Sequence, residues 1–229
     1  MLNPTTARTR APLPAPPLAD ADAFIVLVDG AELHLQQPAP GSITAAALAW
    51  SLAQLNRFTG HARRPYSVAE HSLLVAEILE REHGVTANSL DGAMVLMAGL
   101  MHDAHEAFCG DLHTPGKRAV GPGWRQFEGR LEHAVHNAFA LHGAMALHGE
   151  LVKFADLQAL ATERRDLLPP AATPWTCLAG VQPLRWVNLA SPERTAMAWT
   201  DWRDAWLARL DELDYARNYF AGFAAEARP

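Results

Sequence analysis

The chain has 229 residues, of which 49% are hydrophobic and 19% are charged, and its formal net charge is −6. A chain of this length can bury a sizeable core, so a single domain needs neither disulfides nor a structural metal in order to fold. The acidic balance argues against binding to a nucleic-acid polymer, which requires clustered positive charge. The apolar stretches fall well short of the roughly 20 residues that span a bilayer, and the two cysteines fit a reducing compartment. We therefore expect a cytoplasmic protein that does not bind membranes.

The first part of the chain predicts a leader followed by a β-hairpin. Residues 1–22 are rich in proline and have no periodic apolar pattern, which is typical of a flexible leader without a secretory signal. Asp29-Gly30 then separates two apolar runs, residues 23–28 and 31–35. Such a dipeptide favours a two-residue hairpin turn in which both turn residues have positive φ.

Helical patterns dominate the remainder of the chain. We expect helices from Ser42 to Leu55, Ser67 to about Glu82, Leu90 to about Phe108, Trp124 to Leu141, Leu151 to Leu168, and Ser191 to about Phe220. The sequence thus predicts an all-α fold over residues 23–229, a single helical bundle with a short N-terminal β-hairpin.

Two of these helices carry local signals that the structure can test. In the first, Ile43, Ala46, Ala47 and Trp50 fall on one face, which is expected to be the buried one. In the second, Ser67 and Glu70 form the pattern of a capping box, in which each side chain accepts a hydrogen bond from the other residue's backbone N–H.

The most chemically informative residues are His102 and Asp103, which directly follow the apolar run from residue 92 to 101. A nitrogen and an oxygen ligand are thereby placed side by side at the end of a buried helix. His71 and Asp156, in two other expected helices, would complete a set of two nitrogens and two oxygens, although His71 alone could equally be a core histidine. This donor set suits one divalent ion per chain, either Mn, Co, Ni, Fe or Zn, with Mg a poorer match.

With these residues in place, the chain resembles the HD-domain metal-dependent phosphohydrolases, and within them the bacterial 5′-deoxynucleotidase branch. The matching segments are NRF (56–58), SVAEHS (67–72), MHDAHEAFCGDLHTPGK (101–117) and KFADLQALATERRDLLP (153–169). They cover roughly half of the chain, and HDxxE followed by GDLxTPxK is a specific pattern. The resemblance implies that His71, His102, Asp103 and Asp156 are the metal ligands.

The resemblance also implies roles around the metal. Glu106 would orient the attacking water, and Asp111 would hold that water or protonate the leaving alkoxide. Arg57 and Phe58 match an Arg-Trp pair that contacts the phosphate and the sugar, and the change to phenylalanine leaves the preference for deoxyribose over ribose open. The expected substrate-binding residues, most of them cations that would attract an anionic ester, are Arg57, Phe58, His61, Arg64 and Lys117.

Less specific interpretations remain open for single residues. Glu106 could be a helical i,i+4 partner of His102, and Asp111 could be a turn residue. The tryptophans at 199, 202 and 206 form a helical stripe that packs on the core or on a second subunit, which allows for a homodimer.

The expected function is hydrolysis of a small nucleotide, most simply removal of the 5′-phosphate of a (deoxy)nucleoside monophosphate. The same site would also serve a (deoxy)nucleoside triphosphate triphosphohydrolase or a nucleotide phosphodiesterase. A non-catalytic nucleotide sensor is the alternative of a different class.

Overall fold

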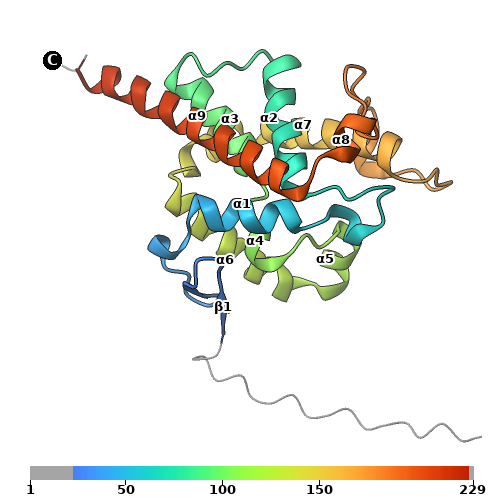
Figure 1. Ribbon diagram of the computed structural model, residues 1–229, viewed down its shortest axis with the longest axis horizontal. Coiled ribbons are helices and arrows are strands. Elements are labelled where there is room, and N and C mark those ends of the chain that lie inside the picture. The colour runs from blue at the N-terminus through green and yellow to red at the C-terminus, as the bar shows by residue number, and fades with distance from the viewer. Residues whose placement is uncertain (1–22, 227–229) are drawn as a thin grey trace, which may run out of the picture.

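The computed structural model describes residues 23–226, which form a helical bundle with a small hairpin at one end (Figure 1). The expected leader, residues 1–22, lies outside the described residues. The elements are β1 (Phe24–Val26), β2 (Glu32–His34), η2 (Pro40–Ser42), α1 (Ala45–Gln54), η3 (Arg57–Gly60), α2 (Val68–Arg81), α3 (Leu90–Met101), α4 (Glu106–Cys109), α5 (Thr114–Val120), α6 (Pro122–Ala138), α7 (His142–Leu167), η4 (Thr176–Leu178), α8 (Pro192–Ala196) and α9 (Trp199–Glu226). The all-α prediction is confirmed. Among the described helices, none has a stretch that is both long and apolar enough to cross a membrane.

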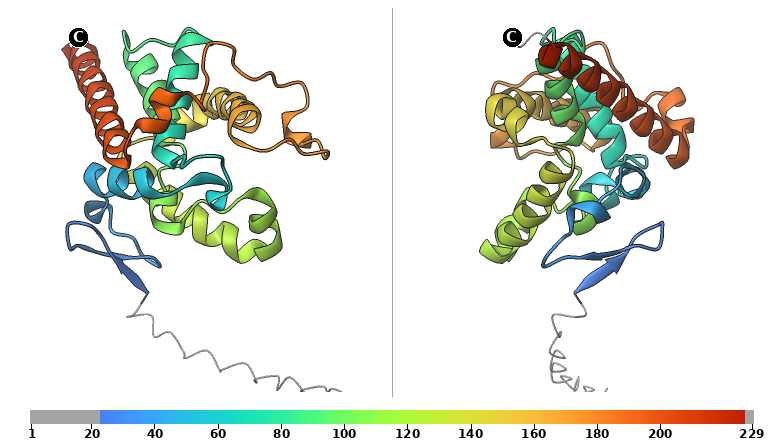
Figure 2. Two further views of the ribbon diagram at one scale, coloured as in Figure 1. Left: turned by 45° about the vertical axis from the view of Figure 1, so that its right-hand side comes forward. Right: turned by 90° about the vertical axis from the view of Figure 1, so that its left-hand side faces the viewer.

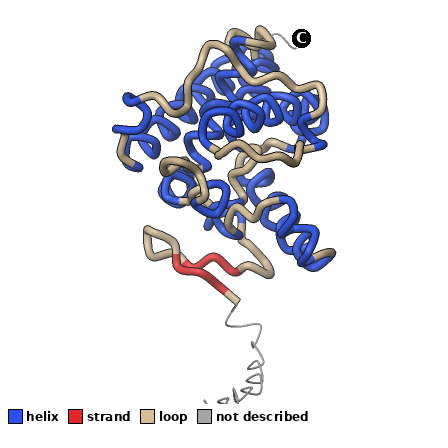
Figure 3. Tube along the Cα trace, turned by 90° about the vertical axis from the view of Figure 1, so that its right-hand side faces the viewer, coloured by secondary structure: helices blue, strands red, loops and turns tan. Residues whose placement is uncertain are grey.

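The hairpin forms where the sequence predicts it, but with a different turn. Strands β1 and β2 pair antiparallel, and Figure 3 shows them below the helices. The Leu27 N–H donates to the Ala31 carbonyl and the Gly30 N–H to the Leu27 carbonyl. The loop therefore has three residues, and Gly30, with φ +83°, takes the left-handed position while Asp29 does not. The expectation of positive φ at both positions was wrong, because a three-residue loop with a terminal glycine replaces the two-residue turn.

The core is built around α3. It packs against α2, α7 and α9, while α1 also lies along α9 (Figure 2). A Cβ at Gly99 would lie 2.3 Å from Leu79 Cδ1, so α3 approaches α2 closely because position 99 has no side chain. The start of α2, the end of α3 and the middle of α7 lie close together in the bundle, as the contacts among His71, His102 and Asp156 show.

Helix α1 begins two residues later than the serine signal suggests. Thr44, not Ser42, caps it, accepting a hydrogen bond from the Ala47 N–H at 3.1 Å. Ser42 instead donates to a carbonyl within its own turn. The expected buried face was also wrong at Ala46 and Trp50, which are exposed, because the core side of α1 is the one that carries Leu48 and its neighbours.

The helix expected from Leu90 to Phe108 is interrupted. α3 ends at Met101, and tight turns join it to α4, with Ala104 donating to the Met101 carbonyl and Glu106 to the Asp103 carbonyl. Periodicity did not reveal this break because Ala104, Ala107 and Phe108 continue the helical spacing of apolar residues beyond Met101. As a result, Glu106 is not one turn along the same helix from His102, and His102-Asp103 stands at a helix end.

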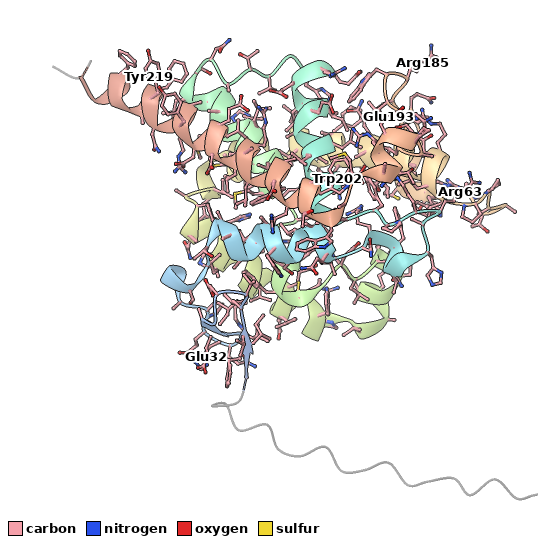
Figure 4. The ribbon with its side chains drawn as sticks, in the orientation of Figure 1. Glu32, Arg63, Arg185, Glu193, Trp202 and Tyr219 are labelled. Atoms are coloured by element: carbon pink, nitrogen blue, oxygen red, sulfur yellow. The ribbon has the colours of Figure 1, made fainter. Side chains whose placement is uncertain are left out.

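The later helices differ from expectation mainly at their boundaries. α7 begins at His142 instead of Leu151, α5 was not predicted, and the expected C-terminal helix is divided into α8 and α9. Trp206 is fully buried. Trp199 is exposed at the start of α9, where its ring lies 5.0 Å from that of Trp50. In Figure 4, Trp202 lies near the start of α9 and Tyr219 toward its far end.

The capping box at the start of α2 forms only in part. The Ser67 hydroxyl accepts from the Glu70 N–H at 3.1 Å, as expected. The Glu70 carboxylate, however, binds Arg64 at 2.8 and 2.7 Å and Arg194 at 3.0 Å. The reciprocal half of the prediction was wrong, because two arginine side chains compete for the carboxylate. Glu70 is fully buried, so this ion cluster ties α2 to the segment that begins α8.

We predict that Glu70→Gln lowers the free energy of unfolding by about 3 kcal/mol, because it leaves buried guanidinium charge without its anion. Glu77→Gln on the same helix is the control. Glu77 forms an exposed i,i+4 pair with Arg81, and its loss should cost less than about 0.5 kcal/mol. Urea denaturation of both variants measures the difference. Equal costs would show that the Glu70 cluster does not stabilise the fold.

Candidate metal centre

Four side chains from three helical segments converge at the end of α3. The Nε2 atoms of His71 and His102 are 3.2 Å apart. Asp103 Oδ2 lies 3.6 Å from the first and 3.2 Å from the second of these nitrogens. Asp156 Oδ1, from α7, lies 3.3 Å from the first and 3.9 Å from the second. The structure thus brings together all four residues expected to be metal ligands.

The Nε2 atoms of the two imidazole rings face the place where the four side chains converge. His71 Nδ1 is 2.6 Å from Glu163 Oε1, and His102 Nδ1 is 2.8 Å from the Gly99 carbonyl oxygen. Each contact requires the proton on Nδ1, because carboxylate and carbonyl oxygens only accept. When both rings are neutral, their Nε2 atoms are acceptors that face each other, so a cation, either a proton or a metal ion, is needed between them.

The donor set fits a divalent cation. Bonds of about 2.0–2.2 Å from a metal to nitrogen or carboxylate oxygen place neighbouring ligand atoms about 3–3.5 Å apart, close to the spacing found here. Two lone pairs and two carboxylates packed together repel one another unless a positive charge lies between them. The donor set can therefore hold a metal, and ligand atoms of His71, His102 and Asp103 all lie within 4.8 Å of one another.

Glu163 is the residue at this centre that sequence reasoning missed. Sequence analysis gave it no role, yet it is fully buried. One of its oxygens accepts from His71, and the other lies 3.4 Å from Arg57. Its position seven residues after Asp156 was the available signal, since i and i+7 lie on the same face of a helix.

Arg57 links the two carboxylates that flank the centre. One of its terminal nitrogens is 3.3 Å from Asp103 and the other 3.4 Å from Glu163. The guanidinium is buried, so it is held by the protein's own anions. Sequence analysis placed Arg57 among the substrate-binding residues, and the structure adds this contact with the ligand set.

The charges at the centre shift the acidities of its groups. Burial and Arg57 lower the pKa of His71, but Glu163 and Asp156 outweigh them and raise it to about 9. Burial raises the pKa of Asp103, yet His102, His71 and Arg57 hold it well below its ordinary value. His71 therefore holds a proton strongly at the point where a metal would bind, as expected of a site with excess negative charge.

Glu106 and Asp111 form a second layer of acidic groups. Burial, followed by the charges of Asp103 and Asp111, raises the pKa of Glu106 to about 10. Its Oε2 is buried without a hydrogen-bond partner among the described residues. Burial also raises the pKa of Asp111, against the opposing effect of Arg57. Lys117 Nζ lies 3.7 Å from Glu106 Oε1, so a cation faces this layer.

A second group of possible ligand atoms lies beside the first. It consists of His105, Glu106 and Glu128. Lys117 Nζ is 2.5 Å from Glu128 Oε1, and an ammonium group at that position already supplies the positive charge. The cluster of His71, His102, Asp103 and Asp156 is therefore the better candidate for a metal ion.

Three expected substrate-binding residues have other surroundings. The Arg64 guanidinium is committed to Glu70 and to the Leu189 and Pro65 carbonyls, so it does not join the basic rim that the sequence suggested. His61 is exposed in the loop before α2. Phe58 lies beside Arg57, with 5.6 Å between the guanidinium carbon and the ring centre, and has a positive φ of 57°. Of the expected cations, Arg57 forms an ion pair with Asp103, and Lys117 forms one with Glu106.

Comparisons with known proteins agree with this geometry. Residues 51–135 match the HD domain family, a range that contains three of the four converging residues and ends before Asp156. The protein YfdR of Escherichia coli K12, itself uncharacterized, is 31% identical over 167 residues, covering 73% of this chain and 85% of its own. An uncharacterized protein of Rhodobacter capsulatus is 40% identical over 115 residues, covering 49% of this chain and 56% of its own.

HD domains bind divalent metals and are generally metal-dependent hydrolases. The family match agrees with the convergence of two histidines and two aspartates, and the similarity to YfdR reaches beyond the matched range into α7. The chain therefore belongs to the HD-domain family.

Proposed function

We propose that this protein is a metal-dependent phosphohydrolase that acts on a small nucleotide, with His71, His102, Asp103 and Asp156 as the metal ligands. The observation that carries the proposal is the convergence of these four donor atoms, with both Nδ1 protons turned away. A divalent ion held there would polarise a phosphoryl oxygen and lower the pKa of water.

The chain's own residues supply the remaining chemistry. Glu106 orients the attacking water through its Oε2, which is buried without a hydrogen-bond partner among the described residues. Burial and the neighbouring acids raise its pKa in the metal-free protein, and a divalent ion at the ligand set would lower it again, so that the carboxylate can accept the proton of the water. Asp111, whose pKa is raised by burial, protonates the leaving alkoxide. Both roles follow the family resemblance of the segment from Met101 to Lys117.

Two cations have separate tasks. Arg57 holds Asp103 and Glu163 in place, so it stabilises the ligand set. Lys117 has a side chain that is 30% exposed, so it can reach a phosphate oxygen and offset the charge that develops on it. Phe58, beside Arg57, offers an apolar surface to the sugar.

The substrate that best suits these residues is a (deoxy)nucleoside 5′-monophosphate. The support is the resemblance of NRF (56–58) and GDLHTPGK (110–117) to the 5′-deoxynucleotidase branch. A triphosphohydrolase or a phosphodiesterase would use the same ligands and remains the alternative, which the product of the reaction distinguishes.

We predict that Glu163→Gln lowers the affinity for Mn²⁺ or Co²⁺ about 10- to 100-fold, because His71 loses the partner that fixes its tautomer and orientation. Competition with a chromogenic chelator measures this affinity. Glu150→Gln, an exposed change on the same helix, should leave it unaltered. Unchanged metal affinity in Glu163→Gln would exclude an orienting role for Glu163.

We predict that Glu106→Gln lowers kcat about 10²- to 10⁴-fold, the usual contribution of a general base, while making the metal-free protein more stable. The folded-state pKa of Glu106, about 10, lies above its unfolded value. The wild type therefore loses stability as pH rises above the unfolded pKa, and glutamine avoids this loss. The difference in unfolding free energy should grow by about 1 kcal/mol or more between pH 5 and pH 8. Parallel stability curves for the two proteins would contradict the assigned environment.

The test of the proposed function is a panel of nucleoside mono-, di-, tri- and cyclic phosphates assayed with Mn²⁺, Co²⁺ and Mg²⁺. Inorganic phosphate, pyrophosphate and triphosphate are measured separately. We expect phosphate release from monophosphates, and loss of both metal and turnover in Asp103→Ala with helical content retained. Full activity in chelator-treated protein would refute the metal-dependent mechanism.

A further inference from the structure

We propose that Glu128 of α6 is a positioning residue, which holds the Lys117 ammonium of α5 in front of Glu106. This role rests on the proposed function, since it assigns the Lys117 ammonium to the reacting phosphate. The family resemblance did not single out Glu128.

The contacts of Glu128 define a short network. Its Oε1 lies 2.5 Å from Lys117 Nζ and 3.6 Å from His105 Nε2. Lys117 Nζ lies 3.7 Å from Glu106 Oε1. Glu128 therefore joins α5 and α6 to the turn between Asp103 and Glu106, where the acidic layer begins.

Partial burial strengthens the attraction between Glu128 and Lys117. The side chain of Glu128 is 17% exposed and that of Lys117 is 30% exposed, so their attraction is less screened than that of a surface pair. A lysine side chain loses rotamer entropy on being fixed, so it stays in one place only where a partner holds it. Without Glu128, the ammonium would be free to move toward solvent.

The arrangement also explains why Lys117 stays charged beside the acidic layer. Burial lowers the pKa of Lys117, but the adjacent carboxylate of Glu128 and the charge of Glu106 raise it above its ordinary value. A charged, positioned ammonium is the form that stabilises an anionic transition state.

A first experiment measures the hold on Lys117 without using activity. The chain has two lysines, Lys117 and Lys153, so acylation by N-hydroxysuccinimide acetate can be followed at both by mass spectrometry. In Glu128→Gln, Lys117 should react about 3- to 10-fold faster relative to Lys153, as a pKa lowered by half a unit to one unit implies. Glu132→Gln, one turn further along α6, is the matched control and should leave the ratio unchanged.

A second experiment tests the positioning role through a double-mutant cycle. We expect Glu128→Gln to lower kcat/KM about tenfold in the wild-type background and less than twofold in a Lys117→Met background, because Glu128 acts through Lys117. A purely structural role would give the same loss in both backgrounds.

The outcomes separate this proposal from the proposed function. An unchanged acylation ratio, or equal losses of kcat/KM in the two backgrounds, would overturn the positioning role. If wild-type protein hydrolysed no phosphate ester, the proposed function would fail, while the acylation ratio would still decide whether Glu128 holds Lys117.

Discussion

The structure depends on a concentration of acceptor atoms at one point inside the bundle. Two imidazole lone pairs and two carboxylate oxygens lie within 3.9 Å of one another along the measured pairs. Such an arrangement is unfavourable unless positive charge compensates it. Arg57 supplies part of that charge from one side, and the remainder is what a divalent ion would provide. A stable fold thereby retains a place for a cation.

The helices around this point explain how the fold tolerates it. α3 is buried along most of its length and approaches α2 closely at Gly99, so His71 and His102 meet across a tight helix contact. Because the helix is interrupted after Met101, Asp103 and Glu106 do not lie on one continuous helix, and both lie beside the metal centre. α7 contributes Asp156 and, two turns later, Glu163, so a single long helix provides both a proposed ligand and the group that orients another.

The sequence predicted the class of fold, and it singled out His102 and Asp103 because an apolar run that ends in His-Asp is hard to explain otherwise. His71 and Asp156 completed the set chiefly through the resemblance to the HD-domain family. It did not predict the break between α3 and α4, since hydrophobic periodicity is the same in one helix or two. It also assigned Arg64 to the site because both sequence proximity and charge favoured it, whereas buried Glu70 binds that side chain instead. Glu163 and Glu128 were overlooked because their partners become neighbours only after folding. His71 lies 92 residues from Glu163 in the sequence, and Lys117 lies on a different helix from Glu128.

The most direct test of the central claim is to locate the bound ion by anomalous diffraction from crystals loaded with Mn²⁺ or Co²⁺. The account predicts one strong anomalous peak, at about 2.0–2.2 Å from His71 Nε2, His102 Nε2, an Asp103 oxygen and an Asp156 oxygen. A peak between His105, Glu106 and Glu128 in its place, or a loaded protein with no ordered ion near His102, would contradict it.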